Sequence, residues 1–296
     1  MDSADLRIFE AVARLGGISR AAQELNTVQS NVTARVRLLE EQIGTPLFER
    51  HARGVTLTAA GKRLLPYAEH IRALLRDANS AVRDDGTPQG LLQVGSLETT
   101  AAMHLAPMLT GFVKRWPLVD LVLRAGTSCE LIDQVLNRDL EGALVCGPVN
   151  HPDLLAETLF EEELVVLTAP HIQHLAWLPG AEDIRIVVLR ASCAYRQKLE
   201  TVLAQRGITG LRKLEFGTLE AVIACVAAGL GVTLLPRRMI GSVWQEGRVA
   251  VHSMPPDMAW VETQFIRRRD GYASSALEAF VAAAKEKVGE AIRRSA

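Results

Sequence analysis

The stretch TVQSNVTARVRLLEEQIG, residues 27–44, decides the fold of the N-terminal part of this chain. Apolar side chains recur in it at steps of four, four, three and four residues. That spacing predicts one amphipathic helix with a single apolar stripe along it. The residues of the stripe are Val28, Val32, Val36, Leu39 and Ile43, and we expect the first four to hold the helix on its domain.

The opposite face of this stretch carries only side chains that can form hydrogen bonds. Its acids, Glu40 and Glu41, lie at the far end, whereas an isolated helix prefers acids in its first turn. An acid-free front half suits a helix that meets phosphates, and the recognition helix of a helix-turn-helix presents its front to base edges. From this helix alone, an ordinary solvated surface helix remains equally open. The candidate DNA contacts are Gln29, Ser30, Asn31, Thr33, Arg35 and Arg37.

The neighbouring segments favour the DNA-binding interpretation. Helical patterns precede it at Ala4–Leu15 and in a short segment for which Ser19 is a plausible N-cap. Residues 46–58, PLFERHARGVTLT, predict two extended pieces around a turn. All charged residues between 50 and 63 are basic, which suits a wing lying on a phosphate backbone. Ser19, Arg50 and Arg53 therefore join the candidate DNA contacts.

These residues resemble the winged helix-turn-helix of LysR-type transcriptional regulators. The family commonly has Pro where this chain has Ser30 and Ser-Arg where it has Thr33-Ala34, so the basic residue moves to Arg35. The resemblance covers residues 1–60 and rests on Phe9, Ala21-Ala22, Leu25, Gln29-Ser30, Leu39-Glu40, Gly44, the PLFER string at 46–50 and the LTAAG string at 57–61.

Residues 58–84 predict a long linker helix that Thr58 caps. Pro66 interrupts its hydrogen-bond ladder near the start, where a kink is expected. Its apolar residues follow a heptad pattern, which favours pairing with a partner helix. The alternative is a helix packed only on its own domain. A dimer formed through this helix would present two recognition helices to a two-fold DNA site. The heptad residues are Leu64, Ala68, Ile71, Leu75, Ala78 and Val82.

After the linker DDGTPQG, residues 84–90, apolar runs alternate with helical patterns, which predicts an α/β domain over residues 85–296. The resemblance implies an effector-binding domain of two sub-domains that resemble periplasmic binding proteins. We expect sub-domain I at about 91–163 and 267–296, and sub-domain II at about 164–266. The predicted strands are 91–95, 120–125, 142–146, 164–168, 185–189, 213–216, 232–235 and 261–267.

Hydroxyl residues follow four of these strands, at the edge where α/β sheets bind ligands. Each one alone is more simply a helix N-cap, but as a set they favour a binding site. Tyr195 and Arg196 add a phenol and a guanidinium, in a string similar to the Gly-Cys-Ser-Tyr-Arg of some LysR-type members. Arg196 either holds a carboxylate or lies on the surface of its helix. The hydroxyl residues are Ser96, Thr99, Thr100, Thr127, Ser128, Ser192 and Thr218.

Composition and motifs weigh against two other classes of protein. The net charge of −1 means that DNA binding must rest on a local basic surface. The sequence contains no nucleophile elbow, P-loop or HExxH motif that would indicate an enzyme. The GLG at 229–231 lacks the spacing of a dinucleotide-binding loop. A solute-binding protein would carry an export signal and no winged N-terminus. We expect no cofactor, no metal at His171 and His174, and buried free thiols at the four cysteines.

The sequence therefore predicts a cytoplasmic transcriptional regulator and no enzyme. Its expected partners are a double-stranded DNA operator, a small-molecule effector and further copies of the chain, with no membrane. The hydroxyls and the arginine favour a small carboxylate or an amino acid as effector. We also expect the chain to form a dimer through the linker helix, to assemble further into a tetramer and to contact RNA polymerase.

Overall fold

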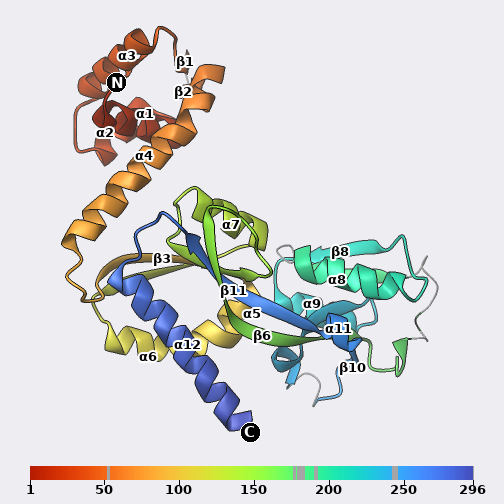
Figure 1. The fold of residues 1–296 in the computed structure, drawn as a ribbon. Coiled ribbons are helices and arrows are strands. Elements are labelled where there is room, and N and C mark those ends of the chain that lie inside the picture. The colour runs from red at the N-terminus through yellow and green to blue at the C-terminus, as the bar shows by residue number, and fades with distance from the viewer. Residues whose placement is uncertain (52–53, 176–177, 179–183, 190–192, 242–245, 296) are drawn as a thin grey trace. The chain divides into compact units, whose positions relative to one another are not determined.

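The computed structural model describes residues 1–51, 54–175, 178, 184–189, 193–241 and 246–295 (Figure 1). Two compact units divide the chain. The N-terminal unit comprises Met1–Asp85 with Asn137–Asp139, and the C-terminal unit comprises Gly86–Leu136 with Leu140–Ala296. None of the helices in the described residues combines the length and the hydropathy that a membrane crossing requires.

The N-terminal unit contains the predicted helices and wing in the predicted order. The second helix begins two residues earlier than expected, since its N-cap is the extended residue Gly17 and not Ser19. Pairing of Phe48 with Leu57 and of His51 with Gly54 makes the wing an antiparallel hairpin. The elements are α1 (Ser3–Leu15), α2 (Ile18–Glu24), α3 (Gln29–Ile43), β1 (Phe48–His51), β2 (Gly54–Leu57) and α4 (Ala59–Arg83).

The core of this unit lies where α1, α2, α3 and the start of α4 meet. Phe9, Val32, Val36 and Leu39 are buried in it, as the helical spacing predicted. Val28 was wrongly predicted to belong to the same stripe. It is the extended N-cap residue of α3 and its side chain is 65% exposed, because the helical period begins only at Gln29.

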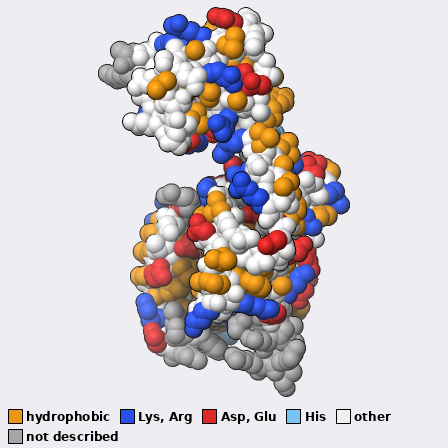
Figure 2. Space-filling view, turned by 90° about the vertical axis from the view of Figure 1, so that its left-hand side faces the viewer, with side chains coloured by type: hydrophobic (Ala, Val, Ile, Leu, Met, Phe, Trp, Pro, Cys, Tyr) orange, Lys and Arg blue, Asp and Glu red, His pale blue; other side chains and the backbone are white. Residues whose placement is uncertain are grey.

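Helix α4 uses its heptad residues in two ways. Leu64, Ala68 and Ile71 pack against the core of the N-terminal unit, as the single-domain alternative proposed. Beyond them Leu75 is 46% and Val82 is 88% exposed. Hydrophobic side chains follow the surface of this helix in Figure 2. Only the second half of the seam is therefore available to a partner helix.

The C-terminal unit is built on a seven-stranded mixed sheet in the order β10-β6-β11-β5-β3-β4, with β9 also paired to β6. A separate parallel pair, β7 and β8, is joined to β9 through a bridge between Ile186 and Val232. The strands are β3 (Gly90–Ser96), β4 (Val119–Ala125), β5 (Gly142–Cys146), β6 (Leu154–Thr168), β7 (Arg185–Leu189), β8 (Arg212–Phe216), β9 (Thr233–Pro236), β10 (Ala250–Ser253) and β11 (Trp260–Arg268).

Short and long helices connect and cover these strands. They are α5 (Glu98–Thr100), the π-helix η1 (Ala101–Leu105), α6 (Ala106–Arg115), α7 (Ser128–Leu136), α8 (Cys193–Ala204), α9 (Leu219–Ala227), the 3₁₀ helix η3 (Arg237–Ile240), α11 (Pro256–Ala259) and α12 (Ser275–Ser295).

All eight predicted strands are present, within two residues at their ends except for one. Strand β6 begins ten residues before the predicted start. Its first part was missed because it carries the acidic run Glu161–Glu163, so no apolar pattern marks it as a strand. Strand β10 was missed. The long strands β6 and β11 pair antiparallel from Leu154–Arg268 to Glu163–Trp260, side by side in Figure 1. Their side chains contribute to every large core of this unit.

The described thiols differ from the expected buried set. Cys146 and Cys225 are partly buried, but Cys129 is exposed because it lies on the outer side of the first turn of α7. The three are free thiols. Burial raises the pKa of Cys146 to about 11, which keeps this thiol protonated at neutral pH.

Candidate nucleic-acid interface and effector site

The front end of α3 has free hydrogen-bonding capacity. Its N-cap, Val28, offers no side-chain oxygen to the first N–H groups, and its first turn contains no acid. Gln29 and Ser30 are exposed there, and neither forms a hydrogen bond with another side chain in the described part of the chain. A helix start of this kind favours an approaching anion and leaves two polar side chains for an outside partner.

Other predicted contacts on α3 have partners within the chain. The Asn31 amide donates to the Thr27 hydroxyl at 2.9 Å. Arg35 Nε lies 2.9 Å from a carboxylate oxygen of Asp5, which is buried at the start of α1. A second carboxylate, that of Asp2, lies 3.3 Å from the same guanidinium. Arg35 therefore joins α3 to α1 and is not the free, outward-facing side chain that the sequence suggested. Thr33 is half-buried and Arg37 is exposed.

The acid at the far end of α3 has a structural role that the sequence did not reveal. One oxygen of Glu40 accepts hydrogen bonds from the backbone N–H groups of Leu47 and Phe48, at 2.7 and 3.1 Å. Those residues begin the wing, so Glu40 fixes the wing to α3. Its position therefore follows from this contact and is not by itself a sign of approaching phosphates.

The wing carries one described candidate, Arg50, which is exposed on β1 opposite Val55. Arg53 lies outside the described residues. Gly54, at the start of β2, has a φ of +138°, and a Cβ atom there would lie 2.8 Å from the Gly16 carbonyl oxygen. This close approach packs the wing against the end of α1. Ser19 is exposed on α2.

In the C-terminal unit, three predicted effector residues meet at the carboxyl ends of neighbouring parallel strands. The Ser128 hydroxyl accepts from the backbone N–H of Cys146 at 3.1 Å, and the Ser96 hydroxyl donates to the Leu97 carbonyl at 3.0 Å. Thr127 caps the start of α7 by accepting from the N–H of Glu130 at 3.0 Å. The three residues lie close together, but each already has a partner in the chain. The simpler N-cap interpretation holds for Thr127 alone, since the bonds of Ser96 and Ser128 cap no helix.

A second group, which we call the buried polar cluster, comprises Thr99, Thr100, His104, Glu162 and Tyr195. His104 Nε2 lies 2.6 Å from Glu162 Oε1, and the imidazole stacks on Phe160 with ring centroids 4.0 Å apart. The side chain of Thr99 lies beside the Tyr195 hydroxyl. Burial, and next the Glu162 carboxylate, raise the pKa of Tyr195. The cluster joins α5, η1, β6 and α8.

Three buried atoms of this cluster have no hydrogen-bond partner among the described residues. They are Thr100 Oγ1, Glu162 Oε2 and the Tyr195 hydroxyl. The side chains that carry them are at least nine-tenths buried. Burying a polar atom without a partner is unfavourable, and most native structures avoid it. The cluster is therefore a place where a bound molecule would complete the hydrogen bonding.

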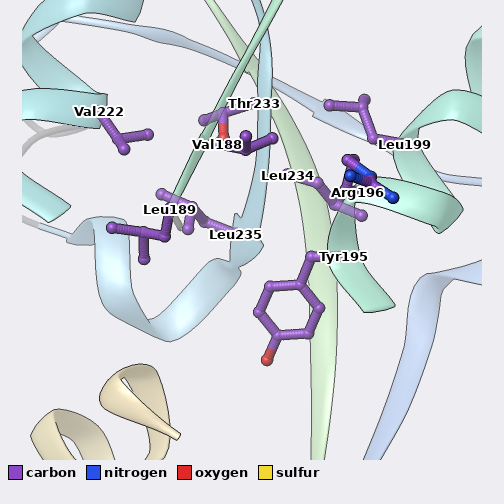
Figure 3. Close-up of a pocket in the computed structure, with 9 residues that line it drawn as sticks. All are labelled: Val188, Leu189, Tyr195, Arg196, Leu199, Val222, Thr233, Leu234 and Leu235. Atoms are coloured by element: carbon purple, nitrogen blue, oxygen red, sulfur yellow. The ribbon is translucent and has the colours of Figure 1, made fainter. Parts of the chain in front are cut away.

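The remaining predicted residues lie elsewhere. Thr218 is exposed and caps α9 by accepting from the N–H of Ala221 at 3.3 Å, while Ser192 lies outside the described residues. Arg196 lies 3.7 Å from Glu200 and lines a small pocket whose other walls are mostly core side chains. Figure 3 shows the Tyr195 hydroxyl pointing away from the other side chains of that pocket. The pocket is thus a gap in the core, distinct from the buried polar cluster.

His104 and Glu162 were not predicted from the sequence. One signal for them exists: His104 follows Thr100 by four residues, and Glu162 is the middle acid of a run that directly precedes an apolar strand. Neither pattern is specific without the fold. Among the described residues, no group of three or more His, Cys, Asp or Glu side chains is arranged to hold a metal ion.

Comparisons with known protein families agree with both units. Residues 3–62 match "Bacterial regulatory helix-turn-helix protein, lysR family", and residues 85–289 match "LysR substrate binding domain". Among curated relatives, the HTH-type transcriptional regulator GltR of Bacillus subtilis is 41% identical over 93% of each chain. CzcR of Bacillus cereus is 39% identical, covering 97% of this chain and 98% of its own.

Solved structures share the fold at lower identity. ArgP from Mycobacterium tuberculosis has a TM-score of 0.69 at 19% identity, covering 97% of each chain. CbnR, a LysR family transcriptional regulator solved in full length with its target DNA, has a TM-score of 0.65 at 21% identity, covering 97% of this chain and all of that one.

Proposed function

Since the chain belongs to the LysR family of transcriptional regulators, we propose which of its residues contact DNA and which bind the effector. The front of α3 enters the major groove of a double-stranded operator, with Gln29 and Ser30 at base edges. Arg37, Arg50 and Arg53 contact phosphates or sugar on either side. The observation that supports this assignment is the acid-free, uncapped start of α3 with its two unpartnered polar side chains.

The exposed second half of the α4 seam supports assembly of the regulator into a dimer. Leu75 and Val82 present apolar surface that a second copy of α4 would cover. Two recognition helices would then meet two half-sites of the operator. We further propose that two such dimers form a tetramer and that the regulator contacts RNA polymerase at the promoter. It would act in the cytoplasm, where the chromosome lies.

The C-terminal domain binds a small molecule, and we propose a small carboxylate or an amino acid as the effector. The buried polar cluster, whose Thr99 and Thr100 follow β3, supports a polar ligand at this edge of the sheet because three of its buried atoms have no partner among the described residues. Effector binding alters operator binding if the ligand prefers one arrangement of the protein over another.

The decisive experiment replaces Gln29 by Ala and measures affinity for operator and random DNA of equal length. We expect discrimination to fall by about 1–3 kcal/mol, the worth of one bidentate base contact, with little change in affinity for random DNA. Gln42→Ala, at the far end of the same helix, is the matched control and should keep full discrimination. A Gln29→Ala protein that distinguishes operator from random DNA as well as wild type does would refute the assignment of α3.

A further inference from the structure

The buried polar cluster carries an inference about the chemical class of the effector, which rests on the proposed function. We propose that Glu162, Tyr195 and Thr100 form a subsite for the ammonium group of a small amine-bearing effector, an amino acid or a simple amine. A carboxylate without an amine would not suit this subsite.

A chain of contacts links the elements that carry the three side chains. Thr100 and His104 are four residues apart on the continuous helical segment formed by α5 and η1, so their side chains leave the same side of it. His104 contacts Glu162 of β6, so the helical segment that carries Thr100 packs against that strand. Tyr195 enters from α8, with its hydroxyl beside Thr99, the neighbour of Thr100, and within electrostatic reach of Glu162.

The hydrogen-bonding capacity of the three unpartnered atoms indicates the chemical class of the ligand. The unpartnered atoms are one carboxylate oxygen and two hydroxyl oxygens, and all three can accept a hydrogen bond. A primary ammonium offers three N–H donors and one positive charge. It would satisfy the three acceptors together and form a charge-assisted bond with Glu162. A ligand carboxylate at the same place would bring a second negative charge to a buried acid.

No described cation already fills this role for Glu162 Oε2. The imidazole of His104 contacts the other oxygen, Oε1, at 2.6 Å. Lys198, whose charge acts on nearby Cys146, donates from Nζ to the Trp260 carbonyl at 2.5 Å. The positive charge that the second oxygen of this buried carboxylate lacks would therefore come from the ligand.

The test uses the full-length protein and matched pairs of probes. Each of the twenty amino acids is compared with the deaminated acid that carries the same side chain. Methylammonium and ethanolamine are added as amines without a carboxylate. Binding is measured by thermal shift and then by calorimetry. We expect at least one amine-bearing probe to raise Tm and its deaminated partner to bind at least ~tenfold more weakly, because a site built around a hydrogen-bonding group rejects analogues without it.

Variants locate the effect. Glu162→Gln keeps the shape and removes the charge, so the amine-bearing probe should bind ~10–100-fold more weakly, whereas Glu161→Gln, an exposed neighbour, should bind as wild type. Tyr195→Phe should also weaken the probe, since it removes one of the three acceptors while keeping the aromatic ring. The inference is wrong if no amine-bearing probe binds. It is also wrong if a deaminated acid binds as tightly as the matching amino acid, both to wild type and to Glu162→Gln.

Operator binding by the same samples separates this inference from the proposed function. Suppose that wild type and Glu162→Gln bind a carboxylate equally well and that this ligand changes operator affinity. That result would support the proposed function and overturn the ammonium subsite. A protein that binds an amine through Glu162 but does not distinguish operator from random DNA retains the subsite and loses the DNA assignment.

Discussion

The recognition helix α3 and the buried polar cluster are assembled in opposite ways. All residues of the α3 surface come from one continuous segment, whose helical period separates buried Leu39 from exposed Leu38. The cluster draws Thr100, Glu162 and Tyr195 from segments more than thirty residues apart. A local period can therefore predict which residues share a face of α3, whereas only the folded sheet brings the cluster together.

The two regions also differ in how their polar groups are satisfied. On α3 the partnered residues Asn31, Arg35 and Glu40 fasten the helix to its own unit, and the unpartnered Gln29 and Ser30 lie in solvent. In the cluster the unpartnered atoms are buried. An unpartnered group in water costs nothing, but a buried one is unfavourable until a ligand arrives. Unpartnered atoms are thus a stronger sign of a ligand in the cluster than on the helix.

The largest expected effect separates the two faces of α3. Leu39→Ala should lower the free energy of unfolding of the N-terminal unit by about 2–5 kcal/mol, because it leaves a cavity in a fully buried position. Leu38→Ala, one residue away and 43% exposed, should change it by less than ~0.5 kcal/mol. Hydrogen exchange of the α1–α3 amides in the two variants would measure both. Equal losses would show that the faces are not assigned as described.

A smaller effect distinguishes the two arginines. Arg35→Ala should cost about 1–3 kcal/mol of stability, since it leaves buried Asp5 without its guanidinium. Arg37→Ala should leave stability unchanged and should reduce the slope of log affinity for DNA against log salt by about 1. Urea denaturation and a salt series with operator DNA would test the pair. An Arg35→Ala protein of full stability that loses preference at a single base pair would restore Arg35 as a base contact.

The smallest effect compares a partnered hydroxyl with an unpartnered one. Thr58 accepts from the N–H of Gly61 at 3.0 Å and donates to the Pro46 carbonyl at 2.9 Å, so Thr58→Ala should cost about 1 kcal/mol. Thr100→Val removes a buried hydroxyl without a partner and keeps the shape. It should change stability by less than ~0.5 kcal/mol or increase it. A large loss in Thr100→Val, measured by urea denaturation without ligand, would mean that this hydroxyl has an internal partner after all.

Sequence patterns predicted most of the fold, because periodicity and caps are local. The three-helix start, the wing, the Thr58 cap and the α/β order were all confirmed. The exceptions have physical reasons. Val28 follows the spacing of the stripe but precedes the helix, and β6 carries acids in a strand that is partly buried.

The site was less accessible to sequence analysis, because a partner far along the chain decides what each polar residue does. Arg35 lies on the polar face by its spacing, yet Asp5 holds it. Thr127 and Thr218 satisfied the pattern of hydroxyls after strands, but each caps a helix. His104 and Glu162 become meaningful only when η1 packs on β6. A rule based on residue type and strand ends detects neither of the last two.

Helix α4 sets a mechanical constraint on any change to this protein. It is continuous from Ala59 to Arg83, so its 25 residues span about 38 Å as a single rod. Each residue inserted beyond Ile71 would turn the exposed Leu75 and Val82 by about 100° relative to the part packed on the N-terminal core. If α4 pairs as proposed, its length can therefore change only in steps of whole heptads, seven residues or about 10 Å at a time.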